Sequence, residues 1–408
     1  MALLPVPDAK AKLLSRAFPV RESELVSLQA ANGRVSAASV VARLTQPPFN
    51  ASAMDGYALR AEDAREVGAV LSVIGTAAAG HPFGGRVGPG EAIRIFTGAA
   101  VPEGADTILI QEDAQPLDGN RVRTKCLVTM GRHIRPRGQD FIQDEAVLPA
   151  GSLLDYSHLA VAAAMNHASL AVYRKPKIAI LATGDELLPP GSIPADGQII
   201  ASNTFGVRAL VEDNGGDVID LGIVADRQDD IRQAVNRARI AGADVLVTLG
   251  GASVGDHDLV QSTLKAAGME LDFWRIAMRP GKPLMVGNLD EMQVLGLPGN
   301  PVASLVCALL FLEPLVRTLA HLPERKREAQ ALAAHDLPAN DQRQDYLRAK
   351  LSQGADGEMT AMPFKKQDSS MMKTFAQSDA LIIRPPHAPV LPARAPCPVL
   401  LLRPFPSV

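Results

Sequence analysis

Residues 244–258 read Asp-Val-Leu-Val-Thr-Leu-Gly-Gly-Ala-Ser-Val-Gly-Asp-His-Asp, and this stretch indicates the fold of the middle of the chain. The first six residues predict a strand buried on both faces, because such strands are runs of apolar residues rather than alternations. The next nine residues hold three glycines, a serine and two aspartates, more than a structural loop requires. We therefore expect a strand that opens into an anion-binding loop of free backbone N–H groups.

Strands and helices alternate on both sides of this stretch. The expected strands are 177–182, 218–224, 244–249, 271–277 and 292–297, and the expected helices are 203–214, 228–241, 259–267 and a helix from Pro301. Such alternation predicts a parallel, doubly wound α/β sheet. In open sheets of this kind, ligands bind outside the carboxyl ends of the strands.

Three further loops lie at predicted strand ends. Thr183-Gly184-Asp185-Glu186 follows the first strand, although a plain turn with a capping Thr or Asp explains it better when it is taken alone. Arg279-Pro280-Gly281-Lys282-Pro283 presents one ammonium group, and a turn between strands explains it equally well. Leu297-Pro298-Gly299-Asn300-Pro301 places Asn300 at an N-cap and Pro301 at N1 of a helix, where an anion can bind. Together the four loops predict a site for a phosphorylated small molecule.

The sequence pattern is different in the rest of the chain. Residues 7–18 and 24–32 have the spacing of short helices. Residues 35–171 hold short β-prone runs between Gly- and Pro-rich turns, with one helix at 159–166. Residues 319–408 hold short strands and predict a small β-barrel or sandwich. The turns at 53–57, 96–99 and 135–140 carry no functional signal by spacing alone.

The composition excludes several classes of protein. The chain has 408 residues, 47% hydrophobic and 21% charged, with a net charge of −3, so it lacks the basic surface of a nucleic-acid-binding protein. Its three cysteines are far apart and no H-E-x-x-H motif occurs, which argues against a disulfide framework and a zinc site. The N-terminus lacks the features of a signal peptide, and the longest apolar run, 302–312, is too short to span a bilayer. We expect a cytoplasmic protein with no membrane partner.

Six segments match the motifs of one enzyme family in the correct order. They are Ser52-Ala53-Met54-Asp55-Gly56-Tyr57-Ala58, Thr97-Gly98-Ala99, Thr183-Gly184-Asp185-Glu186-Leu187, Gly250-Gly251-Ala252-Ser253-Val254-Gly255, Pro280-Gly281-Lys282-Pro283 and Leu297-Pro298-Gly299-Asn300-Pro301. By these motifs nearly the whole chain closely resembles the molybdopterin molybdenumtransferases, the bacterial relatives of the gephyrin E-domain. The chain departs from the family pattern at Asn50-Ala51, Gln139 and Ser369-Ser370-Met371-Met372.

The resemblance implies a homodimer of elongated, multidomain subunits. Each subunit would combine an α/β domain with β-rich modules. The doubly wound α/β domain would have the fold of the molybdopterin adenylyltransferases. Residues 1–45 and 141–175 would form an elongated linker and dimer domain, and residues 46–140 a β-rich domain with the Ser-Ala-Met-Asp-Gly-Tyr motif. Residues 176–318 would form the molybdopterin-binding domain and residues 319–408 the C-terminal β-barrel.

The resemblance also implies a reaction. The family inserts molybdate into adenylylated molybdopterin and releases AMP, assisted by Mg²⁺. The expected catalytic residues are Asp55, Glu186, Asp226 and Asp258, and the expected metal ligands are Glu186, Asp226, Asp256 and Asp258. The expected substrate-binding residues are Thr97, Asp140, Thr183, Gly184, Asp185, Gly250, Gly251, Ser253, Gly255, Lys282, Pro298, Gly299, Asn300 and Pro301. Carboxylates suit Mg²⁺, a hard cation that prefers oxygen ligands.

Other functions compatible with the motifs are a molybdopterin adenylyltransferase and a gephyrin-like scaffold that has kept the fold. A molybdopterin adenylyltransferase and molybdoenzymes are possible protein partners. The resemblance further implies that the Asp55 turn reaches the cleft of the other subunit. Arg343 and Arg348 could meet phosphate or molybdate, but we interpret them as surface arginines.

Overall fold

The computed structural model describes residues 3–251, 259–354 and 357–404. The chain forms two compact units. Unit 1 comprises Met1–Glu24 and Tyr173–Val408, and unit 2 comprises Leu25–Val172.

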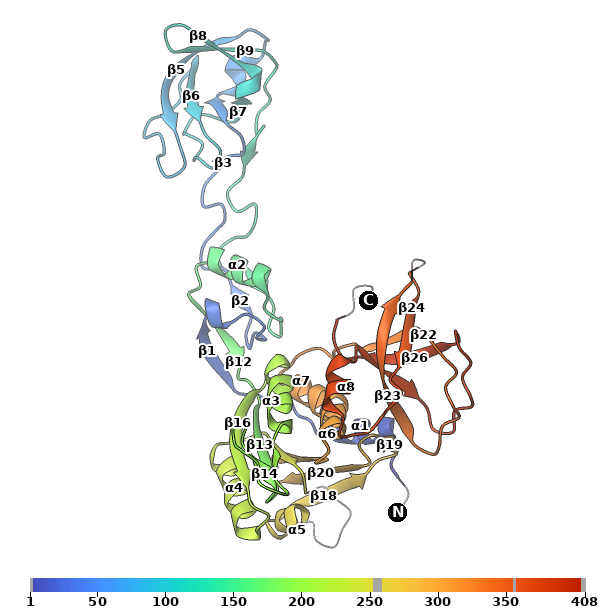
Figure 1. Ribbon diagram of the computed structural model, residues 1–408. Helices are drawn as coiled ribbons and strands as arrows, with labels where there is room; N and C mark the ends of the chain where they lie inside the picture. The colour runs from blue at the N-terminus through green and yellow to red at the C-terminus, as the bar shows by residue number, and fades with distance from the viewer. Residues whose placement is uncertain (1–2, 252–258, 355–356, 405–408) are drawn as a thin grey trace. The chain divides into compact units, whose positions relative to one another are not determined.

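Unit 1 is built on a six-stranded sheet with the strand order β16-β13-β17-β21-β20-β18 (Figure 1). The strands are β13 (Lys177–Thr183), β16 (Asp217–Val224), β17 (Val245–Leu249), β18 (Glu270–Arg275), β20 (Pro283–Leu289) and β21 (Met292–Leu297). The predicted parallel arrangement is correct for β16, β13, β17 and β21. It is wrong for β20 and β18, which run antiparallel. The sequence did not reveal β20, because it joins β21 through a tight hairpin at Asp290 rather than through a helix.

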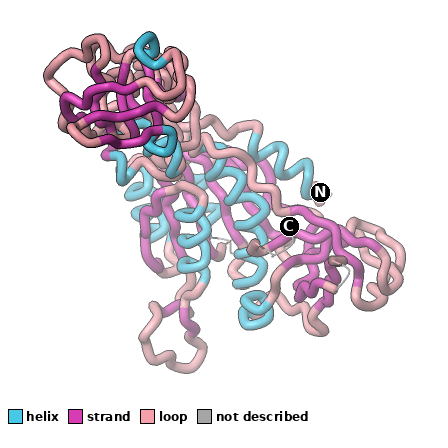
Figure 2. Tube along the Cα trace, turned by 90° about the horizontal axis from the view of Figure 1, so that it is seen from above, coloured by secondary structure: helices cyan, strands magenta, loops and turns pink. Residues whose placement is uncertain are grey.

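Helices cover both faces of this sheet, as the tube view also shows (Figure 2). One core contains the strand residues Ile178 and Ile180, and the other contains Ala179 and Leu181, as expected for a strand with alternating side chains. The first core includes residues of α1 (Val6–Leu14), α3 (Asn203–Asp213), α6 (Pro301–Cys307) and α7 (Glu313–Leu319), and the second includes residues of α4 (Gln228–Ile240) and α5 (Leu259–Ala266). The doubly wound prediction is therefore confirmed.

The helical run Pro301–Leu319 is interrupted by a π-helical turn, η4 (Ala308–Leu312). Pro314 follows this turn and has no N–H to donate to Leu310, so the regular helical hydrogen bonding is broken there. The run is long and apolar enough to cross a membrane, but 83% of it is buried inside the protein. Its apolar side chains belong to the first core of unit 1.

The C-terminal strands form the predicted small barrel. The strands are β22 (Glu328–Ala333), β23 (Gln344–Gln353), β24 (Met359–Pro363), β25 (Ala380–Arg384) and β26 (Pro396–Leu401), with helix α8 (Met372–Gln377) beside them. The barrel closes because β25 pairs with both β26 and β23. A short strand from the α/β layer, β19 (Met278–Arg279), pairs with the start of β23. The pair β14 (Leu187–Leu188) and β15 (Ile199–Ile200) completes unit 1.

Unit 2 is rich in short strands. A six-stranded sheet has the order β7-β4-β6-β5-β9-β8. Its strands are β4 (Gly56–Leu59), β5 (Val70–Ala77), β6 (Glu91–Ile95), β7 (Thr107–Ile110), β8 (Ala114–Leu117) and β9 (Arg121–Thr124). Three strand pairs accompany it: β1 (Ser23–Ser27) with β12 (Ser169–Tyr173), β2 (Val40–Val41) with β11 (Ala146–Leu148), and β3 (Ala51–Ser52) with β10 (Ile134–Arg135).

The helical elements of unit 2 are few and short. They are α2 (Tyr156–Ala164), η1 (Leu28–Ala30), η2 (Ala61–Ala64) and η3 (Gln111–Asp113). Asp155 caps α2 by accepting from the backbone N–H groups of Ser157 and His158. The helix predicted at residues 24–32 is wrong, because this segment forms β1 and the 3₁₀ turn η1. Pairing with β12 supplies the hydrogen bonds that decide its conformation, which local spacing does not show.

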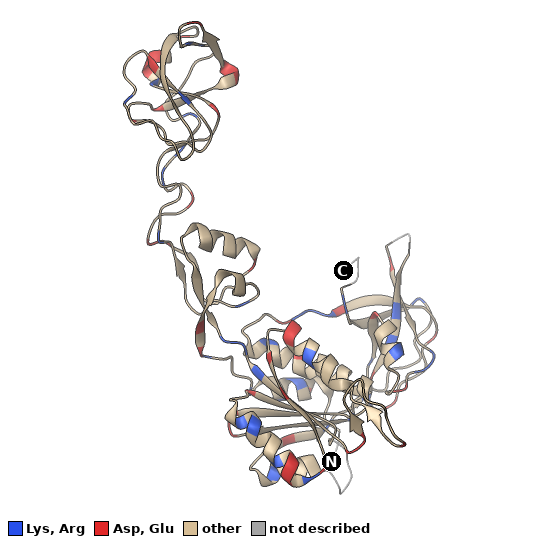
Figure 3. Ribbon diagram, turned by 60° about the vertical axis from the view of Figure 1, so that its left-hand side comes forward, with Lys and Arg blue, Asp and Glu red and all other residues tan. Residues whose placement is uncertain are grey.

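Charged residues of both signs are spread over the helices of unit 1 (Figure 3). One ion pair, Glu313 with Arg327, is buried instead, and Glu313 is only 3% exposed. Arg327 donates from Nε and Nη2 to the two carboxylate oxygens of Glu313, at 2.7 and 2.6 Å. Its Nη1 donates to the carbonyl oxygen of Leu401 in β26 at 3.0 Å. The pair thus fastens α7 to the C-terminal barrel.

We predict that Glu313→Gln lowers the free energy of unfolding of unit 1 by about 3 kcal/mol, because it leaves the Arg327 cation buried without a counter-charge. The double variant Glu313→Leu with Arg327→Met loses much less, because no unpaired charge remains. Trp274, the single tryptophan, lies in β18 and reports the unfolding of unit 1 by fluorescence in urea. Asp229→Asn, in an exposed pair with Arg232, is the matched control and leaves the midpoint unchanged. Equal losses in the single and double variants would contradict this account.

Candidate functional site

The carboxyl ends of the parallel strands surround a cavity of about 790 Å³ in unit 1. The lining residues that the sequence predicted are Thr183, Gly184, Glu186, Asp226, Gly250, Gly251, Pro298, Gly299, Asn300 and Pro301. They come from the loops after β13, β16, β17 and β21. The sheet therefore brings together four loops that are far apart in the sequence.

The loop after β13 is shaped by Gly184. Its φ of +151° disfavours a side chain, and an added Cβ would lie 2.5 Å from a carboxylate oxygen of Glu186, which would have to move. Thr183, at the end of β13, is 5% exposed, and its Oγ1 is buried without a hydrogen-bond partner. A buried hydroxyl of this kind is an unused donor at the wall of the cavity.

Three carboxylates gather near this loop. Asp185 does not line the cavity but accepts a hydrogen bond from the backbone N–H of Asp226 at 3.1 Å, while Glu186 and Asp226 line it. Burial raises the pKa of Asp226 above its usual value, and the negative charges of Asp185 and Glu186 raise it further. The group therefore holds more negative charge than its surroundings balance.

The donor atoms of this acidic group suit a hard cation such as Mg²⁺. Within residues 3–251, 259–354 and 357–404, no three His, Cys, Asp or Glu side chains are close enough together to enclose a metal. Of the four predicted metal ligands, Glu186 and Asp226 share the cavity. Asp256 and Asp258 lie outside the described residues, as do Ser253 and Gly255.

The beginning of the glycine-rich loop is described as far as Gly251. Gly250 has a φ of +98°, and its backbone N–H donates to the carbonyl oxygen of Leu297 at 3.2 Å. That N–H is therefore committed to the neighbouring strand end rather than free for an anion. An added Cβ on Gly250 would lie 2.9 Å from the carbonyl oxygen of Thr183, so the two loops touch backbone to backbone.

The turn after β21 is held from two sides. Asn300 occupies the N-cap position of α6 and Pro301 its first turn, as predicted, but the Asn300 side chain makes no capping hydrogen bond. Its Nδ2 instead donates to Ser369 Oγ at 3.1 Å. Asn203, at the start of α3, donates from Nδ2 to the carbonyl oxygen of Gly299 at 2.8 Å. This turn joins α3, α6 and the barrel segment around Ser369.

Among the polar lining residues that the sequence did not place at the site are Asn203, Thr204 and Ser370. Ser370 belongs to the C-terminal barrel, and Asp368 fixes it by accepting from its backbone N–H and its hydroxyl at 2.8 and 2.6 Å. The Asp-Ser-Ser spacing was the available signal, because an acidic side chain two residues before a serine is typical of such turns.

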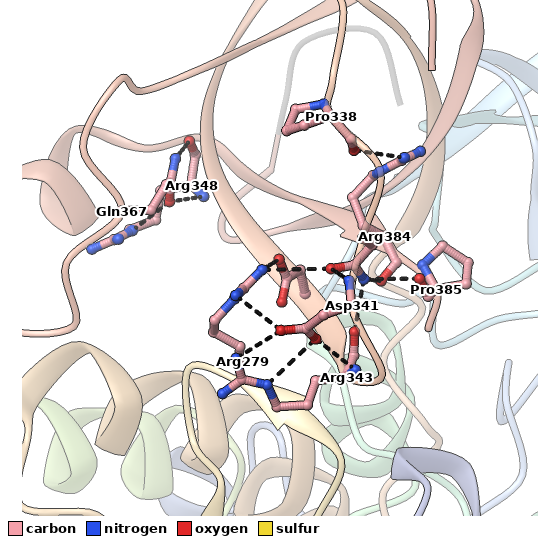
Figure 4. A network of polar contacts seen from close by, with 10 residues as sticks. Arg279, Pro338, Asp341, Arg343, Arg348, Gln367, Arg384 and Pro385 are labelled. Carbon is pink, nitrogen blue, oxygen red and sulfur yellow. Dashed lines mark hydrogen bonds and ion pairs between the residues drawn. The ribbon is translucent and has the colours of Figure 1, made fainter. Parts of the chain in front are cut away.

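The basic residues are not placed as expected. Arg279 is paired with Asp345 and, at 3.3 Å, with Asp341, so it faces the barrel (Figure 4). Lys282 is exposed and does not line the cavity, although its neighbour Pro283 does. The ion pairs of Arg279 with Asp345 and Asp341 hold the pKa of its guanidinium above the usual value, with Asp345 as the largest cause. The charge of Arg279 is therefore already balanced.

The interpretation of Arg348 as a surface residue is wrong. Arg348 is 1% exposed, because it lies within the β23 ladder and turns its side chain inward. Its Nε donates to Gln367 Oε1 at 3.0 Å and its Nη1 to the carbonyl oxygen of Asp368. Its Nη2 is buried without a partner. Arg348 itself does not line the cavity, but Asp368, whose carbonyl oxygen it contacts, lies two residues before the lining residue Ser370.

Asp55, Thr97 and Asp140 belong to unit 2. Asp55 Oδ1 accepts hydrogen bonds from the backbone N–H and the hydroxyl of Thr97, both at 2.8 Å. These bonds lower the pKa of Asp55, and the positive charge of Arg94 adds to the effect. Asp140 does not join them; it lines a separate cavity of about 460 Å³ with Phe49 and Gly98.

Three family models match the chain. They are the MoeA N-terminal region (domain I and II) at residues 4–166, a probable molybdopterin binding domain at 179–318, and the MoeA C-terminal region (domain IV) at 330–402. A molybdopterin molybdenumtransferase from Haemophilus influenzae is 33% identical over 93% of this chain and 94% of its own length. One from Nostoc is 36% identical over 81% and 78%. A crystal structure of the molybdopterin biosynthesis MoeA protein from Pyrococcus horikoshii superimposes with a TM-score of 0.83 at 28% identity, covering 99% of this chain and 100% of that one.

We predict that Asp226→Asn stabilises unit 1 at pH 7 when no divalent cation is present. The pKa of Asp226 is raised on folding, so the folded state holds its proton more strongly than the unfolded chain does. Ionisation of Asp226 therefore costs stability above its ordinary pKa of 3.8, and the variant avoids that cost. The difference between the two urea midpoints, followed by Trp274 fluorescence with EDTA, should shrink as the pH falls from 7 toward 4. A midpoint difference that stays constant over this range would contradict the prediction.

Proposed function

Because this chain belongs to the molybdopterin molybdenumtransferase family, we propose that it transfers molybdenum from molybdate to adenylylated molybdopterin and releases AMP. The chain is a transferase of molybdenum cofactor biosynthesis. In the proposed reaction the phosphoanhydride bond breaks and AMP leaves. An oxygen atom from molybdate or water attacks phosphorus and ends in one of the two phosphates. The dithiolene sulfur atoms bind molybdenum as an oxide ligand leaves, either as water with the two thiol protons or, where molybdate attacks, in the new phosphate.

The observation that supports this proposal best is the cavity at the strand ends of unit 1, with its carboxylates and its unpartnered hydroxyl. Its volume of about 790 Å³ suits a ligand of nucleotide size. Thr183 Oγ1 is in a position to donate to a phosphate oxygen without losing an existing bond. Lys282 is exposed next to Pro283, which lines the cavity, and supplies positive charge at its rim.

We propose that Glu186 and Asp226 bind Mg²⁺ together with Asp256 and Asp258. The raised pKa of Asp226 supports this assignment, because a cation relieves the mutual repulsion of the carboxylates. A bound Mg²⁺ would polarise phosphoryl oxygens and offset the negative charge of the leaving group. Glu186 and Asp226 would hold it at the cavity wall, and Gly184 leaves room for the Glu186 carboxylate.

The barrel contributes a second source of positive charge. The unused Nη2 donor of Arg348 is buried, and the segment Asp368–Ser370 that contacts this arginine reaches the cavity. A fixed, desolvated guanidinium interacts strongly with an oxyanion, whether phosphate or molybdate. We propose that Arg348, which does not line the cavity itself, adds positive potential behind this wall and so favours an anion there.

Asp55 is our candidate for the molybdate end of the reaction. Its lowered pKa keeps it ionised at neutral pH, so it can accept a proton or orient a molybdate hydroxyl. The family resemblance supports a homodimer in which the Asp55 turn of one chain serves the cavity of the other. Thr97, which fixes the Asp55 carboxylate, would belong to the same half of the site.

The proposal is tested by incubating the protein with adenylylated molybdopterin and Mg²⁺, with and without molybdate, and measuring AMP. We predict molybdate-dependent AMP release, reduced more than about 100-fold in Asp55→Ala and in Glu186→Ala, because each variant removes a carboxylate from the reacting region. Thermal unfolding checks that both variants remain folded.

Wild-type turnover in either variant would remove that residue from the site. Formation of adenylylated molybdopterin from ATP and molybdopterin would instead identify an adenylyltransferase. Absence of both reactions with a folded dimer would favour a scaffold.

A mixing experiment tests whether the site needs two chains. We predict that refolding an equimolar mixture of Asp55→Ala and Glu186→Ala restores part of the AMP release, because a mixed dimer contains one site with both carboxylates. Each variant refolded alone is the control and stays inactive. If the mixture also stays inactive while wild-type protein recovers fully after the same treatment, both carboxylates act from one chain.

A further inference from the structure

Arg94 lies at the centre of a cluster of residues in unit 2. None of the residues that it contacts is positively charged. It occupies β6 opposite Tyr57 of β4 and is partly buried. Its guanidinium lies over the rings of Tyr57 and Phe96, 5.1 and 5.0 Å from their centroids. Nη1 donates to the carbonyl oxygen of Gly56 at 3.1 Å, and Nη2 donates to Gln111 Oε1 at 2.9 Å.

Three of the residues that Arg94 contacts are connected with Asp55. Each of them either holds Asp55 itself or is next in the chain to Asp55 or to a residue that holds it. Gly56 directly follows Asp55 in the chain. Phe96 directly precedes Thr97, whose N–H and hydroxyl donate to the Asp55 carboxylate. The backbone N–H of Gln111 donates to the carbonyl oxygen of Asp55 at 3.0 Å. Arg94 therefore ties together the three segments that fix the main chain and the side chain of Asp55.

We propose that Arg94 is a positioning residue, which holds the Asp55 turn and its Thr97 partner in the geometry that the reaction needs. The role rests on the proposed function of Asp55. The arginine is suited to it because its planar group can stack between two rings and donate in two directions at once. A lysine keeps the charge but cannot make this set of contacts.

The backbone next to Asp55 has little freedom to adopt another conformation. Gly56 pairs with both Ile95 and Ile110, and an added Cβ there would lie 2.0 Å from the carbonyl oxygen of Leu109. The strand is thus fixed on the Gly56 side. On the Thr97 side, Phe96 and Thr97 are exposed. The backbone N–H of Phe96 donates to the carbonyl oxygen of Ala77 at 3.1 Å, and contact with Arg94 restrains the Phe96 ring.

The test compares Arg94→Gln and Arg94→Lys with Arg123→Gln, an exposed arginine in β9 of the same sheet. The first readout needs no reaction: the Thr97 amide signal of the full chain, labelled with ¹⁵N-threonine, assigned through Thr97→Ser. Its hydrogen bond to the carboxylate gives it a downfield shift, which we expect to be lost in both Arg94 variants and kept in the control. The second readout is the molybdate-dependent release of AMP.

In that assay we expect kcat to fall about 10- to 100-fold in Arg94→Gln, with KM nearly unchanged, because a displaced carboxylate impairs the reacting geometry and not substrate binding. Arg94→Lys should restore less than about a third of wild-type kcat, because charge alone does not rebuild the contacts. An unchanged Thr97 signal and unchanged kcat in both variants, with Asp55→Ala inactive, would overturn the proposal and leave the proposed function intact. If wild-type protein releases no AMP, the proposed function fails, and the Thr97 signal alone decides whether Arg94 holds the turn.

Discussion

The parallel register of four strands is the constraint on which the candidate site depends. β13, β16, β17 and β21 run in the same direction, and Thr183, Leu249 and Leu297 end their strands at the same edge of the sheet. Residues as distant in sequence as Thr183 and Asn300 therefore line one cavity. The backbone contact between Gly250 and Thr183 and the bond from Asn203 to Gly299 then fix neighbouring loops against one another. A strand of reversed direction among these four would take its loop to the opposite edge.

The barrel determines the surroundings of the arginines that were considered as cations for that cavity. By pairing β19 with β23, it brings Arg279 beside Asp345 and Asp341, and the arginine is neutralised there. The same strand, β23, buries Arg348 and leaves one of its donors without a partner. A charge that is already paired adds little field at a distance, whereas an unpaired buried charge adds much. The barrel thus balances the charge of Arg279 and leaves Arg348 as the candidate cation.

The sequence predicted the α/β layer, the closing barrel and the loops around the cavity, because each of these rests on local patterns. Apolar runs mark β13, β17 and β21, and Gly and Pro mark the loops that follow. The antiparallel β20, the strand β1 and the environments of Arg279 and Arg348 were missed, because each depends on a partner far away in the chain. Ser370 was missed for the same reason. Local spacing shows that Asp368 fixes this serine but not that the barrel presents it to the cavity of the α/β layer.

The two acidic sites, each within its own unit, have opposite electrostatic character. Thr97 donates twice to Asp55, which favours the ionised carboxylate and lowers its pKa. Asp226 has burial and two acidic neighbours instead, which disfavour the ionised form and raise its pKa. Carboxylates with opposite shifts are suited to different tasks, since one is a ready anion and the other gains most from a bound cation or proton. The opposite shifts therefore make Asp55 and Asp226 suited to different roles in the proposed site rather than interchangeable.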